Sequence, residues 1–347
     1  MKQFNKYIIK TGSSIKVALE QLNQLDVEPI LFIVDDNDAL IGSLTDGDVR
    51  RGLIKGTSVN EQVDLICQQN PKFIQKGERD INKIIDFREK KLKTIPVVDK
   101  DYKLVNVINF SELKSYLPID AVIMAGGKGE RLKPLTDNIP KPLLRVGSKA
   151  IIEHNIDRLR LFGIDDFWIS VRYLGNQIEK HIGNGDPKNV IIKYIYEDEP
   201  LGTIGAVSLI EGLDHDYVLV TNSDILTNLN YEQFFLDFLR QDADFSVVTI
   251  PYSVDIPYAV LETSNGHVVS FKEKPTYTYF SNGGIYLMKK KVVNFIPKHT
   301  PFNATDLMEK LISEGLKVIS FPLAGYWLDI GKPDDYQKAQ IDIHSLE

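Results

Sequence analysis

The chain contains very little cysteine: Cys67 is the single one among 347 residues. One cysteine excludes an internal disulfide and a cysteine-rich zinc site, and it suits a reducing compartment. No apolar run approaches the roughly 20 residues that a membrane-spanning helix needs. The first residues also lack the apolar core of a signal peptide. We therefore expect a cytoplasmic protein with no membrane partner.

Basic clusters are also missing. The chain has 41 Lys and Arg residues against 48 Asp and Glu residues, for a net charge of −7. A nucleic-acid partner is therefore not expected, because such proteins carry a basic patch or stripe. With 43% hydrophobic residues the chain can bury an ordinary globular core, and its length favours two domains.

A glycine-rich segment follows a short apolar run about one third of the way along the chain. The run from Ala121 to Ala125 predicts a buried strand, and three glycines then follow within four positions. Glycine leaves backbone N–H groups uncovered, so a loop of this kind can wrap phosphate. The residues that we expect to contact a nucleotide here are Ala125, Gly126, Gly127 and Gly129.

Two cationic residues follow the glycines. Arg131 offers a planar donor fork for phosphate oxygens, and Lys141 lies between two prolines that stiffen its segment. The combined pattern resembles that of the sugar-nucleotide pyrophosphorylases, whose signature is roughly Gly-Gly-x-Gly-Thr-Arg-Leu-x-Pro-Leu-Thr followed by Pro-Lys-Pro. Glu130 stands where that family usually has Thr. The resemblance extends from about Ile119 to Tyr336 and implies a nucleotidyltransferase.

The residues before this segment contain an internal repeat. The stretch from Ile33 to Thr45 aligns without a gap with the stretch from Val97 to Asn109, in apolar positions and in turn residues. Each copy predicts a helix (14–25 and 80–90), a strand, a tight turn, a second strand and a closing helix. Two such units would bury a shared core that neither could complete alone.

This arrangement resembles a tandem pair of cystathionine-β-synthase (CBS) domains, which commonly bind adenine nucleotides. The family's ligand-contacting Thr and Asp correspond to Thr45 and Asp48, whereas the second copy has Asn109 and Glu112. The resemblance implies a regulatory purine nucleotide, and the alternative is that the pair only dimerises. Proline 118 marks the junction. We expect CBS repeats at about 1–57 and 58–117 and a catalytic domain at 118–347.

The remainder alternates strands and helices, which predicts an α/β fold with a Rossmann-like, mixed but mostly parallel sheet. Ligands in such sheets bind at the carboxyl ends of the strands. We expect strands at 167–171, 190–196, 217–221 and 245–250, and helices at 151–162, 174–182, 203–213 and 231–241.

Two carboxylates are candidates for binding Mg²⁺ against a triphosphate. Asp224 follows the strand that ends near Thr221, where a hard oxygen ligand would meet the glycine loop. In the related enzymes the Asp of Trp-x-Asp-Ile-Gly is a second metal ligand, which implies the same role for Asp329. The alternative for both is the capping of a turn or helix.

Two further motifs are implied to bind the sugar phosphate. The resembled family uses Glu-Lys-Pro and Asn-x-Gly motifs for this purpose, which correspond here to Glu273 and Lys274 and to Asn282 and Gly283. An exposed charged turn is the alternative for the first pair. The segment at Gly202 and Thr203 matches a family segment near the base and sugar, and Thr203 could also start the following helix.

These residues predict a reaction without a protein nucleophile. An oxygen of a sugar 1-phosphate would attack the α-phosphorus of a nucleoside triphosphate, and Arg131, Lys141, Asp224 and Asp329 would align the groups and neutralise charge. The domain order most resembles guanylyltransferases of nonulosonic (legionaminic) acid synthesis, which implies GTP and glucosamine 1-phosphate. We also expect a homodimer or a higher homo-oligomer.

Other substrates and another class of protein remain open. Mannose 1-phosphate with GTP, or glucose 1-phosphate with dTTP or UTP, are alternatives within the same reaction. A catalytically inactive nucleotide-sensing protein is an alternative from a different class. The retention of both metal carboxylates and both cations argues against that second alternative.

Overall fold

The computed structural model describes residues 3–25, 29–78 and 80–346. The chain divides into two compact units. Unit 1 contains Met1–Ile119, Asp157–Asp166 and Asn184–Ile191, and unit 2 contains the remaining residues. Across the described residues, no helix has both the length and the apolar character needed to cross a bilayer.

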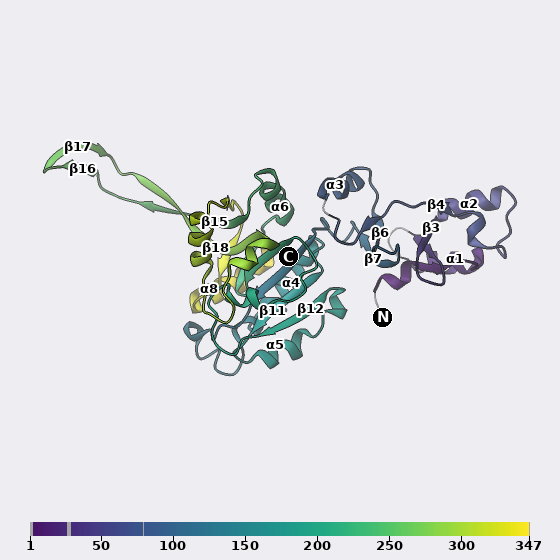
Figure 1. Ribbon diagram of the computed structural model, residues 1–347, viewed down its shortest axis with the longest axis horizontal. Helices are drawn as coiled ribbons and strands as arrows, with labels where there is room; N and C mark the ends of the chain where they lie inside the picture. The colour runs from purple at the N-terminus through teal and green to yellow at the C-terminus, as the bar shows by residue number, and fades with distance from the viewer. Residues whose placement is uncertain (1–2, 26–28, 79, 347) are drawn as a thin grey trace. The chain divides into compact units, whose positions relative to one another are not determined.

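Two small sheets organise the N-terminal part of unit 1 (Figure 1). In each sheet, a helix connects two parallel strands along the chain. The second of these strands then forms an antiparallel hairpin with the strand that follows it. The first copy contains β1 (Ile8–Lys10), α1 (Ile15–Leu22), β2 (Ile30–Val34), β3 (Leu40–Thr45) and α2 (Asp46–Ile54), with β4 (Gln68–Gln69) added beside β3. The second copy contains β5 (Ile74–Gln75), α3 (Ile81–Glu89), β6 (Thr94–Val98) and β7 (Leu104–Asn109).

The internal repeat is confirmed down to the register of its hairpins. Each hairpin has the same irregularity, which follows Ile33 in the first copy and Val97 in the second. In each turn an aspartate, Asp35 or Asp99, accepts two backbone N–H groups at 2.8–2.9 Å. Aspartates that bond to the backbone in this way stabilise a tight turn between strands. The same sequence pattern therefore forms the same hairpin in both copies.

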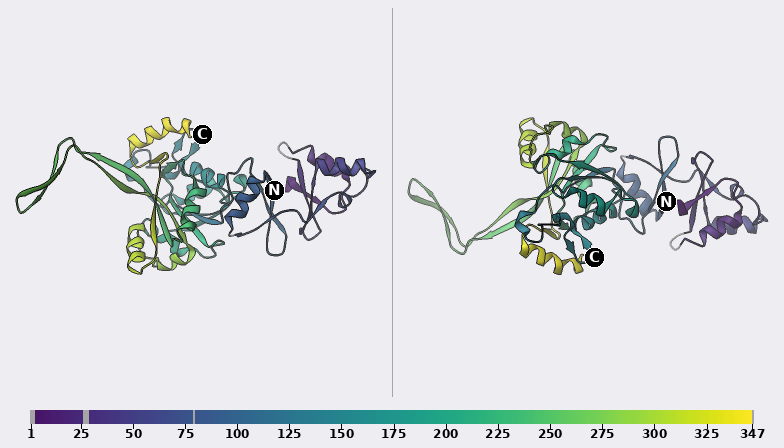
Figure 2. Two further views of the ribbon diagram at one scale, coloured as in Figure 1. Left: turned by 90° about the horizontal axis from the view of Figure 1, so that it is seen from above. Right: turned by 90° about the horizontal axis from the view of Figure 1, so that it is seen from below.

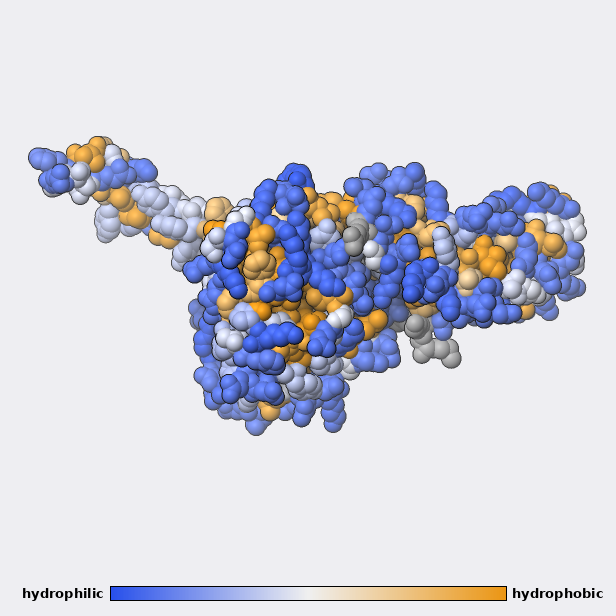
Figure 3. Space-filling view, in the orientation of Figure 1, coloured by the Kyte–Doolittle hydropathy of each residue, from blue (hydrophilic) through white to orange (hydrophobic). Residues whose placement is uncertain are grey.

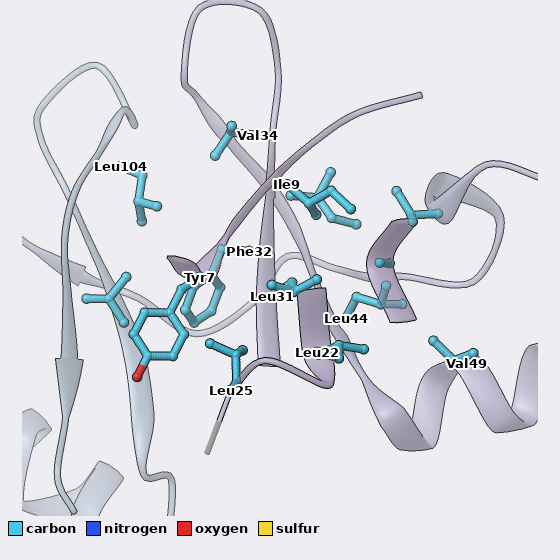
Figure 4. Packing of buried hydrophobic residues seen from close by; sticks show 14 of the residues in the cluster. Tyr7, Ile9, Leu22, Leu25, Leu31, Phe32, Val34, Leu44, Val49 and Leu104 are labelled. Atoms are coloured by element: carbon cyan, nitrogen blue, oxygen red, sulfur yellow. The ribbon is translucent and has the colours of Figure 1, made fainter. Parts of the chain in front are cut away.

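A core shared between the two copies is also present. Figure 4 shows Leu104 from the second copy together with buried residues of the first, among them Phe32 and Val34. The expected shared core is therefore present. The expected closing helix of the second copy is wrong, because residues 110–117 form only one turn on the carbonyl of Asn109. Proline 118 leaves too few residues there to sustain a helix.

A seven-stranded sheet forms the centre of unit 2, in the order β12-β11-β8-β13-β18-β15-β19. β18 runs antiparallel to both neighbours, and β15 runs parallel to β19. The mixed α/β architecture is therefore as predicted. Its strands are β8 (Ile119–Met124), β11 (Asp166–Val171), β12 (Ile191–Tyr196), β13 (Tyr217–Asn222), β15 (Phe245–Asp255), β18 (Thr276–Lys289) and β19 (Val318–Pro322).

Helices accompany this sheet close to where the apolar pattern places them. In α6 (Tyr231–Arg240), buried residues recur at helical spacing at Tyr231, Phe234, Phe235 and Phe238. The other helices are α4 (Ile151–Leu161), α5 (Gly175–Ile182), α7 (Ala304–Ser313) and α8 (Pro333–Asp342), and the short strands are β9 (Arg145–Val146), β10 (Lys149–Ala150), β14 (Ile225–Thr227) and β20 (Trp327–Asp329).

The expected helix at 203–213 is wrong. Only a short 3₁₀ helix, Gly205–Leu209, forms there. The N–H groups of Ile204 and Gly205 both donate to the carbonyl of Phe302, and the N–H of Phe302 donates to Leu201. These backbone bonds hold the segment against the residues before α7, and the backbone of Ile204, with φ −144°, is outside the α-helical range.

An extended hairpin leaves the sheet of unit 2. β15 and β18 continue past the sheet as a two-stranded ribbon that ends in β16 (Val260–Ser264) and β17 (His267–Lys272). We call residues 250–281 the arm. In Figures 1 and 2 the outer part of the arm stands clear of the rest of unit 2 in all three views.

Candidate active site

The glycine loop turns at the end of β8, an interior strand of the seven-stranded sheet. Gly129 has φ 65°, a left-handed conformation that favours glycine, and it precedes a 3₁₀ helix at Glu130–Leu132. A Cβ atom at this position would lie 2.9 Å from the Cβ of Lys141. The glycine therefore allows the loop to pack directly on the segment that carries Lys141.

Glu197 links the same loop to a second segment of the site. Its carboxylate accepts from Ser170 Oγ and, at 3.1 Å, from the N–H of Leu201. A Cβ atom at Gly126 would lie 2.6 Å from Glu197 Oε1, whereas one at Gly127 would meet nothing within 4 Å. Gly126 is thus needed for packing, and the face of Gly127 is open for a ligand.

A cavity of about 570 Å³ lies over this loop and the adjacent strand ends. Its size falls in the range of small-molecule sites. Eight of the residues predicted to bind or act on a nucleotide line it: Gly126, Gly127, Gly129, Arg131, Lys141, Gly202, Thr203 and Asp224. Ala125 does not line it, because that residue is buried and its N–H donates to Ser170 at 2.8 Å.

Four cationic side chains line the cavity: Lys128, Arg131, Lys141 and Arg172. Arg172 was missed in the sequence, although it directly follows the strand β11, where parallel sheets place their ligands. Four cations in one cavity provide an environment that suits a polyphosphate.

The two predicted metal carboxylates lie side by side. β14 and β20 pair antiparallel so that Ile225 is opposite Asp329, and the N–H of Ile330 donates to the carbonyl of Asp224 at 3.0 Å. Lys141 Nζ donates to Asp224 Oδ2. Burial, together with the nearby Asp224 carboxylate, raises the pKa of Asp329 above its usual value.

One oxygen of each of these two carboxylates lacks a hydrogen-bond donor among the described residues. Asp224 Oδ1 and Asp329 Oδ1 are buried and accept no hydrogen bond from the part of the chain that the structure describes. Buried carboxylate oxygens without a donor are costly. The pair therefore has two free oxygen ligands of the kind that a hard divalent cation prefers.

Gly202 and Thr203 have contacts that differ from those expected. A Cβ at Gly202, whose φ is 77°, would lie 2.6 Å from the carbonyl of Phe302. Thr203 Oγ1 accepts the N–H of Ala304 at 2.9 Å, so it satisfies the first turn of α7 and not of a helix that follows it. Both residues still line the cavity.

The four residues predicted to bind a sugar phosphate separate into two pairs. Asn282 and Gly283 lie where β18 enters the sheet, and the Gly283 carbonyl accepts from Trp327 Nε1 at 2.9 Å. The next residue, Gly284, packs against Asn222, which lines the cavity. Glu273 and Lys274 lie exposed on the arm between β17 and β18 and do not line the cavity.

The residues of the predicted CBS ligand site form a helix cap. The side chains of Thr45 and Asp48 satisfy each other's backbone N–H groups at the start of α2. Burial opposes the charge of Asp48, but hydrogen bonds from Thr45, Gln68 and Arg51 outweigh it and lower the pKa of Asp48. Thr45 and Asp48 therefore cap the start of α2, and ligand binding at these residues stays a prediction.

Comparison with known proteins gives a consistent family. Residues 120–345 match the family model described as nucleotidyl transferase. The mannose-1-phosphate guanylyltransferase of Mycobacterium tuberculosis is 30% identical over 234 residues, covering 65% of this chain and 64% of that protein. The UTP–glucose-1-phosphate uridylyltransferase of Synechocystis is 29% identical, covering 65% and 64%. The match thus spans somewhat less than two thirds of these relatives.

Shorter relatives match along nearly their whole length. The D-glycero-α-D-manno-heptose 1-phosphate guanylyltransferase of Aneurinibacillus thermoaerophilus is 30% identical, with 65% of this chain and 98% of that protein covered. The crystal structure of HddC from Yersinia pseudotuberculosis complexed with GMP-PN superposes with a TM-score of 0.50 and 29% identity, covering 65% of this chain and 99% of that one.

Proposed function

Because the chain belongs to the nucleotidyl transferase family, we propose that it transfers a nucleotidyl group from a nucleoside triphosphate to a sugar 1-phosphate and releases pyrophosphate. The observation that carries this proposal is the cavity itself. It combines a glycine loop at the end of β8, four cationic side chains and the carboxylate of Asp224, beside which Asp329 lies.

The cationic side chains and the glycine loop have different roles in the proposed reaction. Arg131, Lys141 and Arg172 bind phosphate oxygens and balance their charge, while the open face of Gly127 lets the triphosphate approach the backbone. A sugar-phosphate oxygen attacks the α-phosphorus in line. The bond from that phosphorus to its bridging oxygen breaks, and pyrophosphate leaves with the electron pair. The protein supplies alignment and charge.

Mg²⁺ is the cofactor that we propose for this site. The free buried oxygens of Asp224 and Asp329 fit it, because Mg²⁺ takes oxygen ligands and keeps water and phosphate oxygens beside one or two carboxylates. When bound, a divalent cation neutralises charge that develops on the phosphates. Such a cation also relieves the repulsion between the two carboxylates.

For the substrates, we propose GTP and glucosamine 1-phosphate, with a role in nonulosonic (legionaminic) acid synthesis. The guanylyltransferases among the relatives and the GMP-PN complex support guanine. Mannose 1-phosphate with GTP is the nearest alternative, and a uridylyltransferase relative keeps glucose 1-phosphate with UTP or dTTP as a second. The reaction exchanges one phosphoanhydride for another, so its equilibrium is near balance.

For unit 1, we propose a tandem CBS pair that binds a purine nucleotide next to Thr45 and Asp48. The support is the duplicated strand–helix–hairpin pattern with its matched irregularities after Ile33 and Val97. Dimerisation without a ligand is the alternative. The two roles are separated by calorimetry with a nucleotide that is not a substrate.

The proposed activity is tested by pyrophosphate release. Purified protein with Mg²⁺ is offered GTP, ATP, CTP, UTP and dTTP, each with glucosamine, mannose and glucose 1-phosphates. Pyrophosphate that requires both substrates supports the proposal, and the best pair identifies base and sugar. Absence of pyrophosphate in every combination contradicts it.

A further inference from the structure

Hydrophilic residues cover most of the face of the molecule drawn in Figure 3, with apolar residues scattered among them. Unit 1 also contains a cavity of about 500 Å³, which we call the unit 1 cavity. All of the residues that line it belong to unit 1. Its volume falls in the range of small-molecule sites, and neither Thr45 nor Asp48 lines it. It is therefore a candidate binding site apart from the proposed nucleotide site of the CBS pair.

Aspartates dominate the charge of the unit 1 cavity. Asp165, Asp166 and Asp186 line it, whereas Lys76 is the single cationic residue among the described residues of its lining. Lys76 Nζ lies 4.0 Å from Asp166 Oδ2, so its charge is matched by one of the three carboxylates. A lining of this sign repels an anion such as a nucleotide and attracts a cation.

The charges next to this cavity leave its sign unchanged. A smaller cavity of about 60 Å³ shares part of the lining, and its further charged residues are Lys6, Arg160 and Glu112. A guanidinium nitrogen of Arg160 lies 4.0 Å from the Glu112 carboxylate. With both cavities counted, four carboxylates stand against three cationic side chains. The whole hollow is therefore net negative.

The negative charge acts directly on the wall of the unit 1 cavity. Asp165 Oδ2 accepts from Asn106 Nδ2 at 3.2 Å and from the Tyr116 hydroxyl at 3.4 Å, which holds this carboxylate in place. Burial, together with the carboxylates of Asp165 and Asp166, raises the pKa of Tyr116. Phe4 adds a second buried aromatic ring to the lining. Aromatic faces attract cations as well as apolar groups.

The three aspartates do not form a metal site. Among the described residues, Asp165, Asp166 and Asp186 are not a group whose ligand atoms all lie within 4.8 Å of one another. Asp166 begins β11 and Asp165 directly precedes it, whereas Asp186 lies in the connection between α5 and β12. Carboxylates on separate segments suit a ligand of several atoms with more than one polar group, and the cavity has room for one.

Two strands lead along the chain from the unit 1 cavity to the active-site cavity. Asp166 begins β11, and Arg172 directly follows that strand. Ile191 begins β12, and Glu197 directly follows it. Asp166 and Ile191 line the unit 1 cavity, whereas Arg172 and Glu197 line the active-site cavity. A ligand that shifts the first residues of these strands therefore acts on two residues that would surround the triphosphate.

We infer that the unit 1 cavity binds a small ammonium compound and that this compound changes the affinity of the active site for its triphosphate. The aspartates accept the charged nitrogen, and the aromatic lining contacts the carbon skeleton. Such a cation is either an aliphatic polyamine or an amino sugar, and the experiment distinguishes the two. The binding is independent of the proposed function, whereas its effect on the triphosphate rests on it.

Calorimetry on the full chain tests the binding without catalysis. Spermidine and glucosamine are titrated separately, and glucose serves as the uncharged counterpart of glucosamine. The inference predicts heat from at least one of the two amines, with one molecule bound per chain, and none from glucose. Absence of heat with both amines at millimolar concentration overturns the site. Equal heat from glucose and glucosamine, without heat from spermidine, overturns the role of the charge.

Two substitutions should change the affinity for the bound amine in opposite directions. Asp186→Asn removes a negative charge at an exposed position, so Kd should rise by about fivefold or more. Lys76→Gln removes the competing cation, so Kd should fall by about threefold or more, which damage to the fold would not cause. Asp101→Asn, at an exposed position that lines neither cavity, is the matched control. An unchanged Kd in either cavity variant overturns the assignment.

Binding of a non-hydrolysable GTP analogue tests the effect on the active site. Its Kd should differ by about threefold or more with and without saturating amine, and the Kd of the amine should differ by the same factor with and without the analogue. Equal affinities overturn the coupling. Failure of the analogue to bind contradicts the proposed function and the coupling that rests on it, while the amine titrations still decide whether the unit 1 cavity is a site.

Discussion

Asp329 lies beside Asp224 because the N–H of Ile330 donates to the Asp224 carbonyl at 3.0 Å and the β14–β20 register places Asp329 opposite Ile225. The two residues are far apart in the sequence but lie together at a partly buried position, and each has one buried oxygen without a hydrogen-bond partner among the described residues. Two neighbouring carboxylates repel each other unless a cation lies beside them. Lys141 supplies one cation, and the proposed metal would supply the second.

Neutralising either carboxylate should abolish most turnover. Asp224→Asn or Asp329→Asn removes a charge without changing shape, so kcat should fall by about a hundredfold or more while the fold survives. Steady-state kinetics with saturating Mg²⁺ and a thermal melt measure both properties. Asp334→Asn, at an exposed position near Asp329, is the matched control. Near-normal kcat in either active-site variant would refute its assignment as a ligand.

The shape of the Arg131 guanidinium should matter as well as its charge. Arg131→Lys keeps the charge but loses the two-pronged donor, so kcat/KM for the triphosphate should fall by about tenfold or more. The exposed Arg240, replaced in the same way, should leave kinetics unchanged. If Arg131→Lys retains wild-type kcat and KM, Arg131 does not bind the triphosphate.

Two adjacent glycines should respond differently to alanine. Gly126→Ala would push a methyl group against Glu197, so we expect a lower melting temperature together with weaker nucleotide binding. Gly127→Ala meets open space, so the melting temperature should hold while KM for the triphosphate rises. Melts without ligand and kinetics on both variants make the comparison. Equal melting temperatures for the two variants would contradict the packing role of Gly126.

Nucleotide binding by unit 1 should depend on the first copy of the repeat. Titration of the full chain with AMP should release heat, and Asp48→Ala should weaken that binding by about tenfold or more because it removes a hydrogen-bond acceptor. Glu112→Ala changes the corresponding residue of the second copy and serves as the control. No heat with AMP, in a chain that sediments as a dimer, would leave dimerisation as the supported role.

The local stability of α2 should fall in acid. The pKa of Asp48 is lowered in the folded state, so its contribution is full above the ordinary value of 3.8 and is lost as the pH falls through the lowered pKa. Hydrogen exchange of the amides of Asp46–Ile54 should show lost protection on acidification. Asp48→Asn should already lack part of this protection at neutral pH. Unchanged protection in that variant would contradict the role of the cap.

Most elements followed from local patterns in the sequence. The spacing of Tyr231, Phe234, Phe235 and Phe238 predicted α6 to within one residue, and the repeated turn aspartates predicted the two matched hairpins. The position of the glycine loop at a strand end followed from an apolar run and the behaviour of parallel sheets. These signals are local, so a single sequence contains them.

Contacts between distant segments could not be predicted in the same way. The segment 203–213, expected as a helix, forms only a short 3₁₀ helix. Its backbone is bonded to Phe302, about a hundred residues away, and such tertiary contacts override local helix propensity. Likewise, the strand expected at 245–250 continues to Asp255, and nothing in its alternation says whether the arm is covered or exposed. The location of Glu273 therefore depends on tertiary structure that the motif alone does not contain.

The position of bond cleavage in the nucleotide tests the central claim most directly. GTP labelled with ³²P at the α-phosphorus is incubated with Mg²⁺ and glucosamine 1-phosphate, and a parallel sample carries the label at the γ-phosphorus. Attack at the α-phosphorus predicts α-label in a sugar nucleotide and γ-label in pyrophosphate, both reduced in parallel by Asp224→Asn. Transfer of γ-label to the sugar, or no labelled sugar nucleotide with any of the five triphosphates and three sugar 1-phosphates, would contradict the account.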